Sequence, residues 1–141
     1  MSEIGQIRSA LAKLSAKVMG ARPVRQVGLT LDGGGSPITT GYKGATVVAF
    51  AGRIIRWCIL ADQTGSLVVD VWKCPFASAP PDSGDSITGS SKPTLSSQQK
   101  AEGYPGTLWA ADVQPGDVIA FNVESASGVQ RATLCLWVSP T

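Results

Sequence analysis

The stretch Arg53–Trp72, RIIRWCILADQTGSLVVDVW, holds two apolar strand patterns separated by a short polar segment. Alternate residues of a strand share one face, so the odd-numbered apolar residues of both halves should face one core. They are Ile55, Trp57, Ile59, Ala61, Leu67, Val69 and Val71. Odd residues pair with odd residues only across a loop with an odd number of residues. The stretch therefore predicts a hairpin with the loop Gln63-Thr64-Gly65, in which Gly65 adopts a positive φ.

A second hairpin is expected near the C-terminus, from the strand patterns at 113–123 and 129–138. An even loop, 125–128, would connect its strands. The inward residues would be Ile119, Phe121, Val123, Ala132, Leu134, Leu136 and Val138. Further strands are expected at 24–31 and 45–50.

A long polar segment, 73–106, interrupts the strand patterns. It is too long for an idle loop in a compact domain, so we expect an ordered excursion. Its anchors would be Ile87, Leu95 and Tyr104, with a helical turn at 96–101 and a strand at 107–111. The many strand and turn signals, with no alternation of strands and helices, predict a mostly β domain over 24–141. An antiparallel β-sandwich is expected, with a jelly roll preferred.

The N-terminal segment, 1–23, is expected to be a helical arm, helical over 3–18 with Ser2 as its N-cap. Its apolar stripe repeats at alternating spacings of three and four and consists of Ile4, Ile7, Leu11, Leu14 and Val18. Residues 1–27 carry five basic residues, Arg8, Lys13, Lys17, Arg22 and Arg25, against Glu3, a net charge of +4. The stripe would pack either on its own domain or on another subunit, and the basic charge favours the second. A nucleic-acid arm is disfavoured, because no aromatic residue stands among these charges to stack on bases.

Composition excludes several classes of protein. The 141 residues are 43% hydrophobic and 16% charged, which indicates a single globular domain with a substantial core. The absence of His removes the commonest general base and metal ligand. Three widely spaced Cys suit neither a disulfide framework nor a zinc site. We expect no enzyme activity and no cofactor. No signal peptide and no membrane-spanning run are recognised.

Two sets of residues are candidate sites. Asp32, Asp62, Asp70 and Asp117 lie near expected strand ends, but their spacing matches no calcium-loop motif. Trp72 and Trp137 fall on the outer faces of their strands, where an uncovered indole is costly. They would mark a ligand surface or, as we prefer, a subunit interface.

The segments DGGGSPITTG, LADQTGSLVVDVWK and PGDVIAFNVESASGVQRATLCLWV, with the intervening SITGSSKPTLSS, resemble small virion proteins of tailed bacteriophages. That group includes jelly-roll capsid decoration, or cement, proteins and related tail or fibre domains. The resemblance covers about residues 28–138, leaves the arm outside, and brings no catalytic residues.

The resemblance implies a non-enzymatic decoration protein made in the host cytoplasm and bound to the outer capsid surface. Its expected partners are the major capsid protein and itself, as a homodimer or homotrimer, without direct nucleic-acid or membrane contact. Arm residues Ile4, Ile7, Leu11, Leu14, Val18, Arg8, Lys13, Lys17 and Arg22, with Trp72 and Trp137, are the expected contact residues. The alternative is a sugar-binding or structural module of a tail or fibre.

Overall fold

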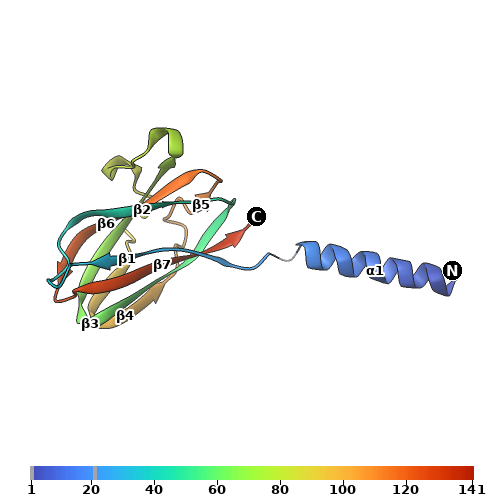
Figure 1. Cartoon of the computed structure of the whole chain (residues 1–141), viewed down its shortest axis with the longest axis horizontal. Coiled ribbons are helices and arrows are strands. Elements are labelled where there is room, and N and C mark those ends of the chain that lie inside the picture. The colour runs from blue at the N-terminus through green and yellow to red at the C-terminus, as the bar shows by residue number, and fades with distance from the viewer. Residues whose placement is uncertain (1, 21) are drawn as a thin grey trace.

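The computed structural model describes the backbone of residues 2–20 and 22–141, with side chains for all of these except 15–20. The chain is mostly antiparallel β-sheet with one N-terminal helix, as expected (Figure 1). The elements in chain order are α1 Glu3–Gly20, β1 Arg25–Asp32, β2 Gly41–Val47, β3 Gly52–Pro75, β4 Thr94–Gly103, β5 Asp112–Val113, β6 Asp117–Ser127 and β7 Arg131–Pro140. Two short 3-10 helices, η1 Phe76–Ser78 and η2 Ser83–Asp85, lie between β3 and β4.

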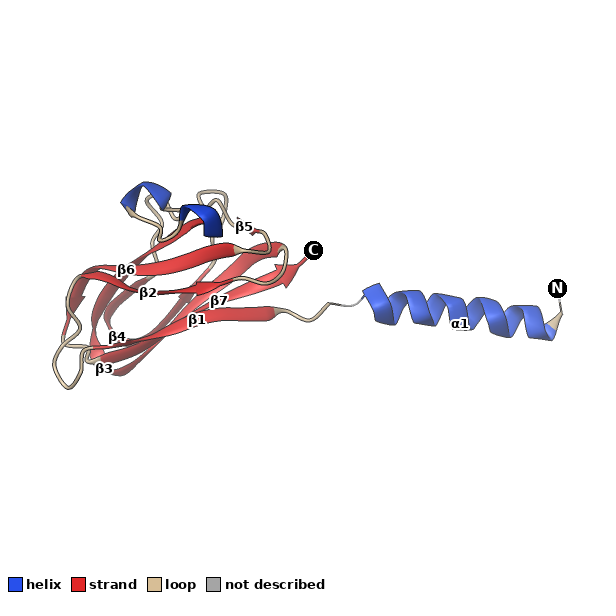
Figure 2. Ribbon diagram, turned by 45° about the horizontal axis from the view of Figure 1, so that its top comes forward, coloured by secondary structure: helices blue, strands red, loops and turns tan. Residues whose placement is uncertain are grey.

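The strands form one curled sheet in the order β1-β7-β3-β6-β2, with β4 and β5 also paired to β3. The curl brings two halves of the sheet face to face (Figure 2). One half contains β1, β7 and the first part of β3, and the other contains β2, β6 and the second part of β3. Strand β4 pairs with both parts of β3. The core therefore lies between two halves of a single sheet.

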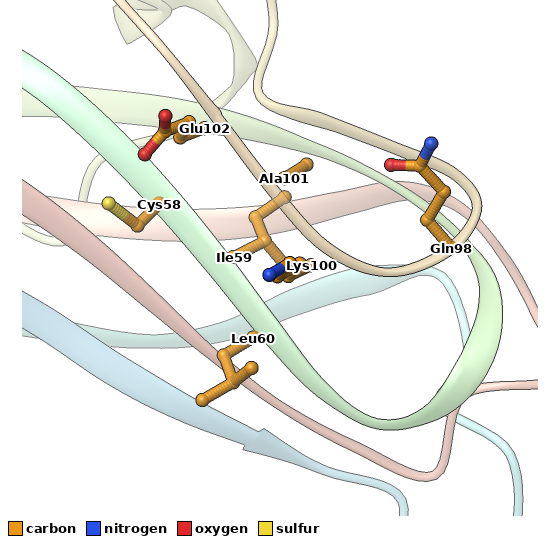
Figure 3. Close-up of a pocket in the computed structure, with 7 residues that line it drawn as sticks. All are labelled: Cys58, Ile59, Leu60, Gln98, Lys100, Ala101 and Glu102. Atoms are coloured by element: carbon orange, nitrogen blue, oxygen red, sulfur yellow. The ribbon is translucent and has the colours of Figure 1, made fainter.

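The hairpin predicted at Arg53–Trp72 is wrong in its pairing. Strand β3 runs without interruption through Gln63-Thr64-Gly65 and bends back broadly (Figure 3). Residues 52–61 pair with β7, and residues 66–75 pair with β6. The two apolar halves of the stretch thus face each other across the core instead of sharing hydrogen bonds.

The second predicted hairpin is wrong for the same reason. Strands β6 and β7 follow each other in sequence, but each pairs with a different part of β3, which lies between them in the sheet order. The side-chain alternation is nevertheless confirmed. All seven predicted inward residues of these strands are buried: Ile119, Phe121, Val123, Ala132, Leu134, Leu136 and Val138.

The predicted core face of β3 is confirmed except at its start. Trp57, Ile59, Ala61, Leu67, Val69 and Val71 are buried. Ile55 is 38% exposed, whereas Ile54 is 1% exposed. The register between β3 and β7 shifts between Ile54 and Arg56, and such a bulge moves the alternation by one residue. The alternation of apolar residues in the sequence does not indicate a bulge, so the prediction placed Ile55 on the wrong face.

The expected positive φ at Gly65 is also wrong. This glycine is required for a different reason, which is close packing. A Cβ at Gly65 would lie 2.5 Å from the carbonyl oxygen of Ser127 and 2.6 Å from Cγ2 of Val129. The bend of β3 therefore presses directly against the connection between β6 and β7.

The polar segment after β3 is an ordered excursion, as expected. Ile87 and Leu95 are buried anchors, whereas Tyr104 is 71% exposed, so that third anchor is wrong. The helical turn predicted at 96–101 is also wrong, because these residues belong to β4. The strand predicted at 107–111 consists of turns and irregular backbone. Residues 94–103 form a strand because their backbone N–H and C=O groups pair with β3. The side chains of this segment are mostly polar, so their pattern does not reveal the pairing.

Candidate functional site: the helical arm and the outer face of the sheet

Helix α1 extends away from the curled sheet in both views (Figures 1 and 2). Ser2 caps its start, since the Ser2 hydroxyl oxygen accepts the Gly5 N–H at 3.1 Å. The apolar stripe lies open to solvent: Ile4, Ile7, Leu11 and Leu14 are 64%, 55%, 59% and 58% exposed. The remaining predicted stripe residue, Val18, lies outside the described side chains. We define the arm stripe as Ile4, Ile7, Leu11 and Leu14.

The basic residues of the arm are also accessible where they are described. Arg8 and Lys13 are exposed on α1. The Arg22 guanidinium donates a hydrogen bond from Nη1 to the backbone carbonyl of Thr141, at the end of the chain. Lys17 lies among the residues whose side chains are not described. The structure therefore brings an apolar stripe and positive charge together on one extended element.

Trp72 lies on the face of β3 opposite the core residue Val71, as predicted, but it is only 8% exposed, so the expectation of an uncovered indole is wrong. Its indole Nε1 donates a hydrogen bond to Asp70 Oδ2 at 3.0 Å. The excursion covers it, with a bridge between Trp72 and Ser86, and the Tyr42 ring lies 6.2 Å from the Trp72 ring. The chain covers this indole itself, and Trp72 offers no surface to a partner.

Trp137 does lie on the outer face of the sheet, where it is 37% exposed. The Arg56 guanidinium carbon lies 4.5 Å from the centre of its ring, within cation–π range. Arg56 also forms an ion pair with Glu102. On its other flank, Trp137 borders a shallow groove of about 250 Å³ with Val24, Arg25 and Gln26. The two predicted Trp residues thus fall in different surroundings, one buried and one half-open.

A larger groove of about 540 Å³ lies between β3 and β4 on the same outer face (Figure 3). Its lining includes Cys58, Leu60, Lys100 and Glu102, and Leu60 is 62% exposed. The groove combines the apolar Ile59 and Leu60 with the polar Gln98 and the opposite charges of Lys100 and Glu102.

The four Asp residues considered as a calcium site do not form one cluster, and only Asp32 and Asp62 line a common groove. Asp70 is buried and Asp62 binds backbone N–H groups of Gln130 and Arg131. Asp32 accepts the N–H of Gly34, which is the main reason that its pKa is lowered, with a further contribution from Arg131. Asp117 accepts the N–H of Gln114. Within the described ranges, no three His, Cys, Asp or Glu residues lie close enough together to hold a metal ion.

Sequence reasoning missed a row of residues that runs across four strands on the outer face. Gly28, Cys135 and Cys58 lie opposite one another across β1, β7 and β3, and Glu102 of β4 continues the row. The Gln26 amide donates to the Cys135 sulfur at 2.8 Å. Burial raises the pKa of the Cys135 thiol, with a smaller contribution from Cys58. Only strand register reveals such a row, since its members are far apart in sequence.

No protein-family model matches the chain, and no curated protein matches its sequence. Among the described residues, no helix has the length and apolar character needed to span a membrane.

Proposed function

We propose that this chain is a structural, non-enzymatic protein of a bacteriophage virion. In this proposal it decorates the outer capsid surface and stabilises neighbouring major capsid subunits. The observation that carries the proposal is the exposed, unpaired stripe of α1, held clear of the sheet. The sequence resemblance to phage decoration proteins supplies the setting.

The arm stripe gives a physical reason to expect a partner. Helix α1 has 18 residues, little more than the roughly 12–15 residues below which an isolated helix is marginal in water. Each large apolar side chain that becomes buried contributes about 1.5–3 kcal/mol before the cost of ordering. Burial of four such side chains on a partner would therefore make a docked arm far more stable than a free arm. Arg8 and Lys13 would add an attraction to an acidic surface that weakens with salt.

The curled sheet supplies a rigid body for such a role. Its buried apolar core joins both halves, and the continuous strand β3 connects them covalently. The jelly-roll topology belongs to this proposal. A decoration protein with a jelly-roll fold would have to share strand β3 between its two halves.

The direct test is the composition of purified virions. A decoration protein should be present in hundreds of copies per particle, in a fixed ratio to the major capsid protein, because icosahedral surfaces repeat their binding sites. Quantitative gel or mass-spectrometric measurement gives this ratio. A chain that is absent from washed particles would contradict the proposal.

The second candidate is a sugar-binding or structural module of a tail or fibre, and the half-exposed Trp137 favours it. Aromatic rings stack on apolar faces of ligands, and Trp137 borders a groove. However, Arg56 already covers one face of its ring. This candidate predicts only a few to tens of copies per virion and glycan binding that Trp137→Ala abolishes. Neither is expected of a decoration protein.

A further inference from the structure

The spacing of the apolar residues on α1 is narrower than that of an ordinary surface helix. Written as heptads, Ile4, Leu11 and Val18 occupy the a position, and Ile7 and Leu14 occupy the d position. A helix that packs on its own domain usually adds apolar residues at e or g. Here the flanking positions hold Arg8 and Ser15 at e and Glu3 and Lys17 at g, and the apolar residue among them is the small Ala10 at g. A seam of a and d residues fits another helix, because helices that supercoil keep such a seam in contact.

The charges beside the seam point to a partner of the same sequence. In a parallel coiled coil, a g residue of one helix faces the e residue five positions later on its neighbour. Glu3 and Arg8 are a g residue and the e residue five positions later, with opposite charges. Within one helix, neighbours on the surface are three or four residues apart, so these two side chains do not pair along their own helix. Two copies of α1 in parallel would bring them together.

We propose that the arm stripe binds the same stripe of other copies, in a parallel coiled coil of three chains. This inference rests on the proposed function for the arm's role in assembly, and it names the arm's partner. Ile4 at a with Ile7 at d, and Leu11 at a, disfavour two strands, whereas Leu14 at d and Val18 at a fit the dimer preference for Leu at d and β-branched residues at a. Four strands would draw the e and g positions further into the interface, where the charged Arg8 and Lys17 stand.

A parallel assembly would also gather the curled sheets at one end of the helices. Only four residues, 21–24, separate the end of α1 at Gly20 from the start of β1 at Arg25. Val24, which is 51% exposed, lies beside Trp137 at this end of the sheet. Three sheets, each joined to the helices by only these four residues, would approach one another here. The half-open Trp137 would then lie close to the contact between neighbouring copies.

Sedimentation equilibrium of the full chain, over a range of concentrations, tests the assembly. We expect the mass of three chains for the wild type. Leu11→Lys places a charge in the seam and should weaken assembly by at least about tenfold, because a buried apolar side chain is lost and a charge takes its place. Ser9→Lys adds the same charge at the f position, away from the seam, and should leave the trimer within about threefold of wild type. Circular dichroism should show the same sheet signal in both variants.

A double-mutant cycle at Glu3 and Arg8 tests the parallel orientation. Glu3→Arg and Arg8→Glu each place like charges across the interface and should weaken assembly several-fold. The double variant, Glu3→Arg with Arg8→Glu, places opposite charges across the interface again. It should therefore assemble better than the sum of the two single losses predicts, with most of the loss recovered. An antiparallel arrangement keeps these residues apart and gives additive losses, which would overturn the proposed orientation.

Three results would overturn the inference. They are a monomeric wild type, a wild type of two or four chains, and a Leu11→Lys variant that remains trimeric because the sheets themselves assemble. The outcome is separable from that of the proposed function. A trimer in solution that is absent from virions supports the coiled coil and contradicts the decoration role. A monomer in solution that is abundant on virions contradicts the coiled coil and supports the decoration role, with the arm docked on another virion protein.

Discussion

Single residues decide how closely the elements of this sheet approach, and Gly65 is the clearest case. An added methyl group would come within 2.5 Å of the Ser127 carbonyl oxygen, on backbone that cannot swing aside. We expect Gly65→Ala to lower the free energy of unfolding by about 1–3 kcal/mol, as overpacking does. Chemical denaturation measures this loss. Gly84→Ala is the control, because its new Cβ meets only a side-chain oxygen of Asp82 at 3.1 Å. Equal, small effects at both glycines would contradict the close approach.

The three thiols differ in their surroundings and should differ in reactivity. Cys74 is buried, and burial, followed by the charges of Asp85, Asp117 and Asp82, raises the pKa of its thiol. Only the thiolate is nucleophilic, so iodoacetamide at pH 8 should alkylate Cys74 more slowly than the half-buried Cys58. The lag should shrink as the pH rises through the raised pKa, and it should vanish in denaturant. Peptide mass spectrometry over time resolves the two sites, and equal rates in the folded protein would refute the burial of Cys74.

At the scale of the element, the excursion between β3 and β4 is held by a buried carboxylate. Asp70 Oδ1 accepts the Val71 N–H at 2.8 Å and the hydroxyls of Ser86 at 2.8 Å and Thr88 at 2.6 Å. Asp70 Oδ2 accepts the Trp72 indole N–H at 3.0 Å. All four donors are satisfied by one side chain, which is how a buried charge is tolerated. This network fastens residues 86–88 to β3 and explains why Trp72 is covered.

Asp70→Asn replaces one acceptor oxygen with a donor that faces other donors. We expect a loss of about 1–3 kcal/mol in the free energy of unfolding, the cost of unsatisfied buried groups. Hydrogen exchange should accelerate at the Ile87 amide, which donates to the Val71 carbonyl at 2.9 Å. Asp112→Asn is the control, since the Asp112 side chain forms an exposed ion pair with Arg53. Unchanged exchange at Ile87 in Asp70→Asn would mean that the excursion is held by other contacts.

For the whole molecule, the separation of arm and sheet predicts that their stabilities are independent. The double variant Leu11→Asp with Leu14→Asp should keep the melting temperature and the sheet signal, because the arm stripe packs on no described strand. Under the proposed function, the same variant should fail to enter virions. Circular dichroism and virion composition measure the two effects. Ser9→Asp with Ala12→Asp, which carries the same charges on the opposite side of the helix, should be incorporated normally. Wild-type occupancy of the Leu variant would show that incorporation into virions does not require the arm stripe.

Sequence alone was sufficient for features that depend on local periodicity. The spacing of Ile4, Ile7, Leu11 and Leu14 identified the helix, because side chains three and four apart share a helical face. Alternation identified the inward residues of β6 and β7, because the pleat repeats every two residues whatever strand lies alongside. The anchors Ile87 and Leu95 were found because large apolar residues in a polar segment need burial.

Only the tertiary structure decided what depends on contacts between distant segments. Pairing of β3 with β7 and then β6, instead of with itself, follows from the broad bend at Gly65, and alternation is identical in both arrangements. Covering of Trp72 depends on Asp70, Ser86 and Thr88 meeting across the excursion. Exposure of the arm stripe depends on where the rest of the chain goes, which an amphipathic helix does not specify. Periodicity is a property of one segment, so the sequence reveals it. Register, burial under another segment and exposure depend on two segments, so only the folded structure shows them.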